Sequence, residues 1–243
     1  VIVFLRPLGL RLNSPDVDEQ LKAGALYFEG GAYHDAYTLF NQYSDLSTSK
    51  GYIGIMYLYG KAGLAKSAET AWKYLKNAPE TEPFLVHKGD LALYFSEYGV
   101  LNKINEAKEL YRKAMEQNPE REDYAFRYNV LNQLTKAKDR NKHIDYWNRG
   151  TVYWDHYSFP DGSYSGEVTN RDNSKGAHGW GAFQFKNKEI SIGHFQWLKN
   201  SGECLKILPA NNGIYIEVGT FRNDKLAKGF TIDTDGFISK TGM

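Results

Sequence analysis

Tyr164-Ser165-Gly166-Glu167-Val168 opens a pattern that returns as Ile192-Gly193-His194-Phe195 and again as Gly219-Thr220-Phe221. The glycines that mark the three copies are 27 and 26 residues apart. Before, between and after the copies lie pairs of residues that favour tight hairpin turns, because Asn, Asp and Gly tolerate positive φ. These pairs are Asp161-Gly162, Asn187-Lys188, Asn212-Gly213 and Asp235-Gly236. The pattern therefore predicts a row of antiparallel hairpins over residues 150–243.

These three copies, together with the glycine pair in Gly179-Trp180-Gly181, resemble the MORN repeat family. A unit of that family opens with tyrosine-x-glycine-x-aromatic and closes with paired glycines. The resemblance implies an all-β array of hairpins and a second contact surface for a partner, and members of the family are linked to membranes and phosphoinositides as well as to proteins. It also implies structural repeat positions at Gly166, Gly193, Phe195, Gly219 and Phe221.

The part of the chain before residue 150 has helical periodicity. Ser14-Pro15-Asp16 is typical of a helix start, since it offers a capping side chain and a proline in the first turn. From there, small and aromatic residues recur at the spacing that two antiparallel helices need where their axes approach. Three alanines keep a period of 35 and 36 residues, which is typical of helix pairs. The repeat positions are Gly24, Tyr27, Ala36, Gly54, Tyr57, Ala71, Tyr94, Ala107, Tyr111 and Ala114.

This helical pattern resembles the tetratricopeptide signature, and its lengthened turns with Gly60, Gly63 and Gly99 resemble the Sel-like variant. The resemblance implies an α-solenoid over residues 15–149 with a concave face that binds a protein. Some bacterial Sel-like proteins serve as immunity proteins that block a secreted toxin. The first helix of each pair lines the concave face, which gives a predicted partner-binding set of Phe28, Glu29, Leu58, Tyr59, Phe95 and Ser96.

The expected fold class is α+β with two segregated repeat domains, an α-solenoid at 15–149 and a hairpin array at 150–243. We expect a last, atypical helix pair to cap the solenoid, with a charged turn from Lys136 to Lys142 and an apolar patch at Ile144, Tyr146 and Trp147. Residues 1–14 are expected to be an N-terminal arm or a processed or added segment. Val1–Leu12 is open to three interpretations: a native arm, the remnant of a signal peptide, or an added segment.

The charge balance of the chain indicates which classes of binding partner are disfavoured. The 30 basic and 29 acidic residues leave a formal charge of +1, so no overall field favours nucleic acid or an anionic membrane. From Thr151 onward the ten basic residues are matched by ten acidic ones, which also argues against lipid binding. The compartment stays open: the cytoplasm is slightly favoured, and a periplasmic or secreted protein follows if a signal peptide was removed before Val1. Oligomeric state stays open as well.

The sequence offers no group of residues with catalytic or metal-binding spacing. The six histidines do not pair on one helical turn, and the single cysteine, Cys204, is predicted to be a buried structural thiol. The glycines around His178 are not followed by the lysine and hydroxyl residues that hold a nucleotide. We therefore expect no enzyme activity, no metal and no cofactor.

The expected function is that of a non-enzymatic adaptor or scaffold, which binds a protein of unknown identity through the helical repeats. Two alternatives remain: a bacterial immunity-type protein that neutralises a cognate toxin, and membrane or phosphoinositide binding by the hairpin array.

Overall fold

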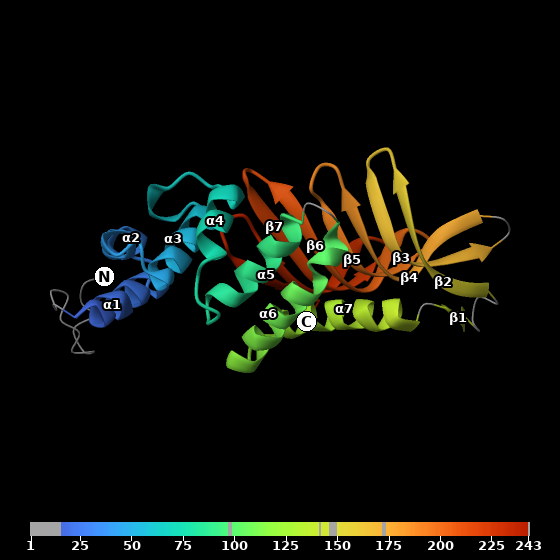
Figure 1. Ribbon diagram of the computed structural model, residues 1–243, viewed down its shortest axis with the longest axis horizontal. Helices are drawn as coiled ribbons and strands as arrows, with labels where there is room; N and C mark the ends of the chain where they lie inside the picture. The colour runs from blue at the N-terminus through green and yellow to red at the C-terminus, as the bar shows by residue number, and fades with distance from the viewer. Residues whose placement is uncertain (1–15, 97–98, 141, 146–149, 172–173, 243) are drawn as a thin grey trace. The chain divides into compact units, whose positions relative to one another are not determined.

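The computed structural model describes residues 16–96, 99–140, 142–145, 150–171 and 174–242. The predicted arm at 1–14 and the residues Ser14, Pro15, Tyr146 and Trp147 lie outside this range. Within it, seven α-helices precede nine β-strands (Figure 1). This confirms the coarse prediction of a helical region followed by an all-antiparallel sheet. By packing, the chain divides into two compact units, 1–80 and 81–243, which are described separately.

The first unit consists of two helix pairs. They are α1 (Val17–Glu29) with α2 (Tyr33–Gln42), and α3 (Ser47–Tyr59) with α4 (Ala68–Leu75), with a 3-10 turn η3 (Lys61–Gly63) between the last two. Asp16 caps α1 by accepting a hydrogen bond from the Asp18 amide. In each pair a glycine of the first helix faces a large side chain of the second: a Cβ on Gly24 would lie 2.9 Å from the Phe40 ring, and one on Gly54 2.7 Å from Leu75.

The second unit begins with a third helix pair of the same construction, α5 (Phe84–Tyr94) and α6 (Ile104–Gln117), with a 3-10 turn η4 (Val100–Asn102) before α6. A Cβ on Gly89 would lie 2.5 Å from the Tyr111 ring. The large residue always follows a fully buried alanine by four positions, which places both on one helix face. The three combinations are Ala36 with Phe40, Ala71 with Leu75, and Ala107 with Tyr111.

Helix α7 (Glu122–Arg140) includes Lys136 to Arg140, which is most of the segment from Lys136 to Lys142 that the sequence predicts to be a charged turn. Val130, Leu134 and Ala137 are buried along one side of α7, and the charged side chains of Lys136 to Arg140 are exposed, so these charges do not end the helix. The predicted last helix pair is therefore wrong, because Ile144 belongs to a strand, β1 (Lys142–Asp145). One strand thus precedes residue 150.

The strands of the described chain form one antiparallel sheet in sequence order, each paired with the next. After β1 they are β2 (Gly150–Phe159), β3 (Gly162–Arg171), β4 (Ser174–Phe185), β5 (Ile190–Gln196), β6 (Lys199–Ala210), β7 (Gly213–Arg222), β8 (Lys225–Ile232) and β9 (Ile238–Thr241). A row of small residues runs across β3 to β8 as successive register partners: Gly166, Gly181, Gly193, Cys204, Gly219 and Gly229. The three glycines that marked the sequence pattern therefore meet in one line.

One face of the sheet lies against α7. The helix packs across β3 to β7 (Figure 1). The Phe126 ring of α7 lies 6.1 Å from the ring of Phe230 on β8. The register places Phe230 in one row with Val218, Leu205 and Ile192, so these side chains share that face. We call it the covered face; its buried residues are Ile190, Ile192, Leu205, Ile207, Ile216 and Val218.

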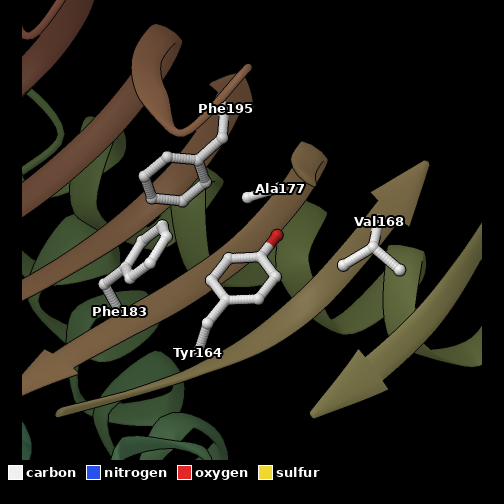
Figure 2. Packing of buried hydrophobic residues seen from close by; sticks show 5 residues of the cluster. All are labelled: Tyr164, Val168, Ala177, Phe183 and Phe195. Atoms are coloured by element: carbon white, nitrogen blue, oxygen red, sulfur yellow. The ribbon is translucent and has the colours of Figure 1, made fainter. Parts of the chain in front are cut away.

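The opposite side, which we call the aromatic face, carries Tyr164, Phe183 and Phe195 (Figure 2). Tyr164 lies over the glycine row, since a Cβ on Gly181 would overlap its hydroxyl oxygen. That hydroxyl donates to the Glu167 carbonyl at 2.8 Å. Glycine at Gly166 and Gly181 thus makes room for the ring of Tyr164.

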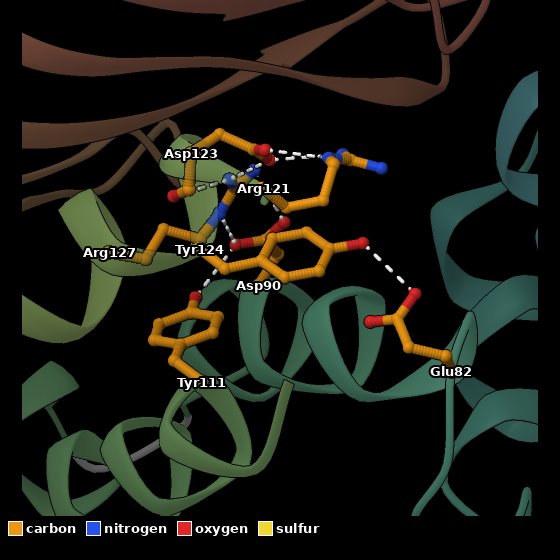
Figure 3. Close-up of polar contacts among 7 residues, drawn as sticks. All are labelled: Glu82, Asp90, Tyr111, Arg121, Asp123, Tyr124 and Arg127. Carbon is orange, nitrogen blue, oxygen red and sulfur yellow. Dashed lines mark hydrogen bonds and ion pairs between the residues drawn. The ribbon is translucent and has the colours of Figure 1, made fainter. Parts of the chain in front are cut away.

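A buried ionic network fixes the three helices of the second unit (Figure 3). Arg127 of α7 donates to Asp90 of α5 at 3.0 Å and to Asp123 at 2.9 Å. Tyr111 of α6 donates to the same Asp90 at 2.7 Å. Burial raises the pKa of Asp90 although Arg127 opposes it, whereas at Asp123 the effect of burial is outweighed by Arg127 and Arg121 and the pKa is lowered. The network gives α7 a defined position beneath the sheet.

Candidate functional site

The predicted partner-binding residues lie at the ends of α1, α3 and α5. Phe28 is half-buried, with its ring centroid 5.3 Å from those of Tyr33 and Tyr52, and Glu29 is exposed. Leu58 and Tyr59 are only 1% and 7% exposed. Three of the four positions from the first unit thus take part in packing, and Glu29 is the one with an exposed side chain.

Phe95 and Ser96 contact the sheet of their own unit. The Lys188 ammonium, in the β4–β5 turn, lies 5.3 Å from the Phe95 ring centroid. Gln184 of β4 donates to the Ser96 carbonyl at 3.1 Å and accepts from the Val100 amide at 2.9 Å. These contacts attach the segment after α5 to the sheet.

The aromatic face holds a pocket of about 620 Å³, which we call the aromatic pocket. Five aromatic rings from three strands line it, and Leu198 and several polar or charged side chains form its border. The ring centroids of Phe159 and Phe185 are 5.8 Å apart, and those of Phe183 and Phe195 are 5.0 Å apart. The lining residues are Tyr157, Phe159, Phe183, Phe185, Phe195, Leu198, Glu189, Ser191, Asn200, Lys206 and Asp224.

Strand alternation explains why these rings meet. Tyr157 and Phe159 are two residues apart on β2, as are Phe183 and Phe185 on β4, so each pair faces one side of the sheet. The strand between them, β3, has Gly162 in register with both Phe159 and Phe185. Because glycine has no side chain, the two phenylalanines close over it.

Hydrogen bonds fix the polar border of the pocket. Ser191 donates to the Asn200 side-chain oxygen at 2.7 Å, and the Asn200 amide side chain donates to Asp224 at 3.1 Å. Asp224 also accepts from the Asn200 backbone amide at 2.8 Å. The Lys206 ammonium donates to the Asp224 carbonyl at 3.0 Å. The border is therefore ordered before any ligand arrives, which reduces the entropy lost on binding.

The β5–β6 turn beside the pocket is made of Trp197 and Leu198, with φ of 51° and 69°. Bulky residues rarely adopt this left-handed conformation, whereas Asn and Gly do so readily. The corresponding turns at Asn211-Asn212 and Asn223-Asp224 follow that preference. Trp197 and Leu198 are also 38% and 56% exposed. Two large apolar side chains are thus held at the surface in an unfavourable backbone conformation.

The sequence predicts a structural role for Phe195 and no role for the other pocket residues. The signal was present in two aromatic pairs at a spacing of two, Tyr157 with Phe159 and Phe183 with Phe185, and in a hairpin turn without Asn or Gly. Neither signal says which strands become neighbours. The pocket could be located only once the register was known.

Cys204 and His194, two side chains of reactive types, are held in contacts within the sheet. Cys204 is buried, as predicted, and burial raises the pKa of its thiol to about 12, which keeps it from acting as a nucleophile near neutral pH. His194 lies 2.7 Å from the Ser201 carbonyl, a contact within the sheet. Across the part of the chain that is described, no three His, Cys, Asp or Glu side chains are grouped to hold a metal ion.

Comparison of the sequence with protein-family models and with curated proteins found no match. None of the helices described is both long and apolar enough to cross a membrane.

Proposed function

We propose that this protein is a non-catalytic protein-interaction module, and that the aromatic pocket is where a partner segment binds. The observation that carries the proposal is the pocket of about 620 Å³ with five aromatic rings and a hydrogen-bonded polar border. Concave, mostly apolar sites with a few fixed polar groups are the usual form of a binding site. Aromatic side chains also supply much of the energy at protein interfaces.

We further infer that the helix pairs are of the Sel-like type and the hairpins of the MORN type. The first inference is supported by the threefold recurrence of a helix-facing glycine and of an alanine followed four positions later by a large residue. The second is supported by the glycine row and by Tyr164 lying over it.

The concave face of the helical repeats remains a proposal for a second contact surface. Phe28, Tyr59 and Phe95 were expected to be its aromatic anchors. Because Tyr59 is buried and Phe95 contacts Lys188, we rank this surface below the aromatic pocket.

The test is an affinity capture of endogenous partners with three proteins side by side: the parent, Phe159→Ala in the pocket, and the triple variant Phe28→Ala, Tyr59→Ala, Phe95→Ala. Loss of a central aromatic residue weakens protein binding by roughly 1 to 4 kcal/mol. We therefore expect Phe159→Ala to lose the partner and the triple variant to keep it. Phe237→Ala is the matched control, since this ring is 68% exposed and does not line the pocket.

Equal recovery with the parent and Phe159→Ala would contradict the pocket as the binding site. Loss with the triple variant alone would move the site to the helices, provided that its circular dichroism spectrum and melting temperature match those of the parent. Binding to liposomes in place of any protein would support the lipid alternative.

A further inference from the structure

We propose that the aromatic pocket selects a partner segment in which an arginine stands beside an apolar residue, with Glu189 as the counter-charge for the arginine. This rests on the proposed function and adds to it the chemistry of the segment that is bound. Three features of the pocket support it: its charge, the freedom of the Glu189 carboxylate, and the apolar surface next to that carboxylate.

The charged groups that line the pocket are two carboxylates and one ammonium, Glu189, Asp224 and Lys206. They leave a net charge of −1. The ammonium is already engaged, because it donates to the Asp224 carbonyl at 3.0 Å and lies 4.9 Å from the Phe221 ring centroid. The pocket therefore complements a cationic group.

Glu189 is the group that lacks a partner. Its backbone amide donates to the Asn187 side chain at 3.0 Å, but within the described chain its half-buried carboxylate makes no hydrogen bond or ion pair. The neighbouring Lys188 does not neutralise it, since that ammonium lies over the rings of Tyr94 and Phe95. A partly desolvated carboxylate without a counter-ion gains more from pairing with a cation than a fully hydrated one.

Arginine matches this combination of groups better than lysine. A guanidinium stacks on aromatic faces and can pair with a carboxylate through two parallel hydrogen bonds, whereas an ammonium is a compact, strongly hydrated charge. The rings of Phe159, Phe183 and Phe185 supply the faces, and Glu189 supplies the carboxylate.

The apolar residue beside the arginine of the partner segment can bind to an apolar surface next to the pocket. Leu198 lines the pocket and is 56% exposed, and Trp197 beside it is 38% exposed. An apolar side chain that packs on Leu198 removes both from water. The pocket and the β5–β6 turn thus form one site with an acidic part and an apolar part.

The experiment titrates the full chain with two matched peptides, acetyl-Ala-Leu-Arg-Leu-Ala-amide and the same peptide with citrulline in place of arginine. Citrulline keeps the shape of arginine and removes its charge. We expect the arginine peptide to bind about tenfold more tightly, which is within the range of a partly buried charge pair. In Glu189→Gln the arginine peptide should bind about as weakly as the citrulline peptide, and the citrulline affinity should stay within about twofold of the parent's.

Glu203→Gln is the control, because it removes one carboxylate from the same sheet at a residue that does not line the pocket. It should keep the arginine preference. Equal affinities of the two peptides for the parent, no binding of either, or an arginine preference that survives in Glu189→Gln would each overturn the inference.

The failure of this inference can be told from failure of the proposed function. If both peptides bind equally and both are weakened by Phe159→Ala, the pocket is a binding site without arginine selection. If Phe159→Ala affects neither peptide and also keeps the captured partner, the pocket itself is not the site.

Discussion

Gly193 and Gly219 occupy positions where the adjacent strand leaves no room for a methyl group. A Cβ at Gly193 would lie 2.5 Å from the Glu203 carbonyl oxygen, and one at Gly219 would overlap the Lys228 carbonyl oxygen. Their φ values of 158° and 151° also disfavour a side chain. The sequence pattern marked these glycines by their spacing, and the structure supplies the contact that makes them necessary.

We therefore expect Gly193→Ala and Gly219→Ala each to lower the free energy of unfolding by at least about 1 kcal/mol. Gly99→Ala is the control for φ alone, because Gly99 has φ of 100° and no atom within 4 Å of the place that a methyl group would take. The free energy of unfolding of Gly99→Ala should fall by less than that of either strand variant. Chemical denaturation measures all three, and strand variants as stable as the parent would show that the strand register is wrong.

Arg127 is the buried positive charge between Asp90 and Asp123, and all three side chains are at most 3% exposed. Removing it leaves two buried carboxylates without that compensation. Arg127→Met should therefore lower the free energy of unfolding by about 3 to 5 kcal/mol.

Arg112→Met is the matched control, because Arg112 also pairs with two carboxylates, Glu109 and Glu116, but on an exposed helix surface. Its loss should change the free energy of unfolding far less, because solvent screens an exposed ion pair. Denaturation of the two variants under the same conditions gives the comparison. Equal losses would mean that burial does not set the strength of the Arg127 network.

Among the elements of the sheet, the hairpin turns differ in how well their residues suit a left-handed backbone conformation. Trp197-Leu198 and Asn211-Asn212 have nearly the same backbone, with φ of 51° and 69° against 46° and 62°. Only the second pair has residues that favour it. The unfavourable pair is the one beside the aromatic pocket, which is where strain is expected if the turn serves binding.

Leu198→Asn should accordingly stabilise the protein by about 1 kcal/mol, since the strain is relieved and the leucine side chain is more than half exposed. The opposite substitution at the equivalent position of the β6–β7 turn, Asn212→Leu, should destabilise the protein by a similar amount. Thermal unfolding of both variants tests the pair. If Leu198→Asn is destabilised, the leucine makes apolar contacts that outweigh the strain.

At the scale of the whole molecule, secondary structure and packing divide the chain at different places. The change from helix to strand falls between Arg140 and Lys142, whereas the compact units meet between Glu80 and Thr81. The reason is α7, which packs across β3 to β7 and shares the ionic network with α5 and α6. Three helices and the sheet therefore form one compact unit.

A fragment of residues 81–243 should fold cooperatively, with a circular dichroism spectrum of mixed helix and strand. A fragment of residues 151–243 should instead aggregate or bind a hydrophobic dye, because it exposes the covered face with Ile192, Leu205 and Val218. Circular dichroism and sedimentation of the two fragments provide the measurement. A monomeric, cooperatively folding 151–243 would contradict this role of α7, and a helical spectrum from it would contradict the strand assignment itself.

The order of helices and hairpins, and the places where small residues are required, can be predicted from the amino-acid sequence. These features depend on local periodicity, on turn residues and on a repeat spacing, all of which are written along the chain. Gly24, Gly54, Gly193 and Gly219 could be identified in this way. Which repeat family they belong to stays a proposal.

Three features became visible only in the folded chain: α7 covers one face of the sheet, Asp90 contacts Arg127 across 37 residues, and rings from β2, β4 and β5 enclose a pocket. Each of these depends on contacts between segments far apart in sequence. Aromatic residues at alternate positions of a strand are compatible with a core, an interface or a pocket. Which of the three they form depends on what packs on that face of the sheet. The partner site could therefore be sought only after the two faces of the sheet were known.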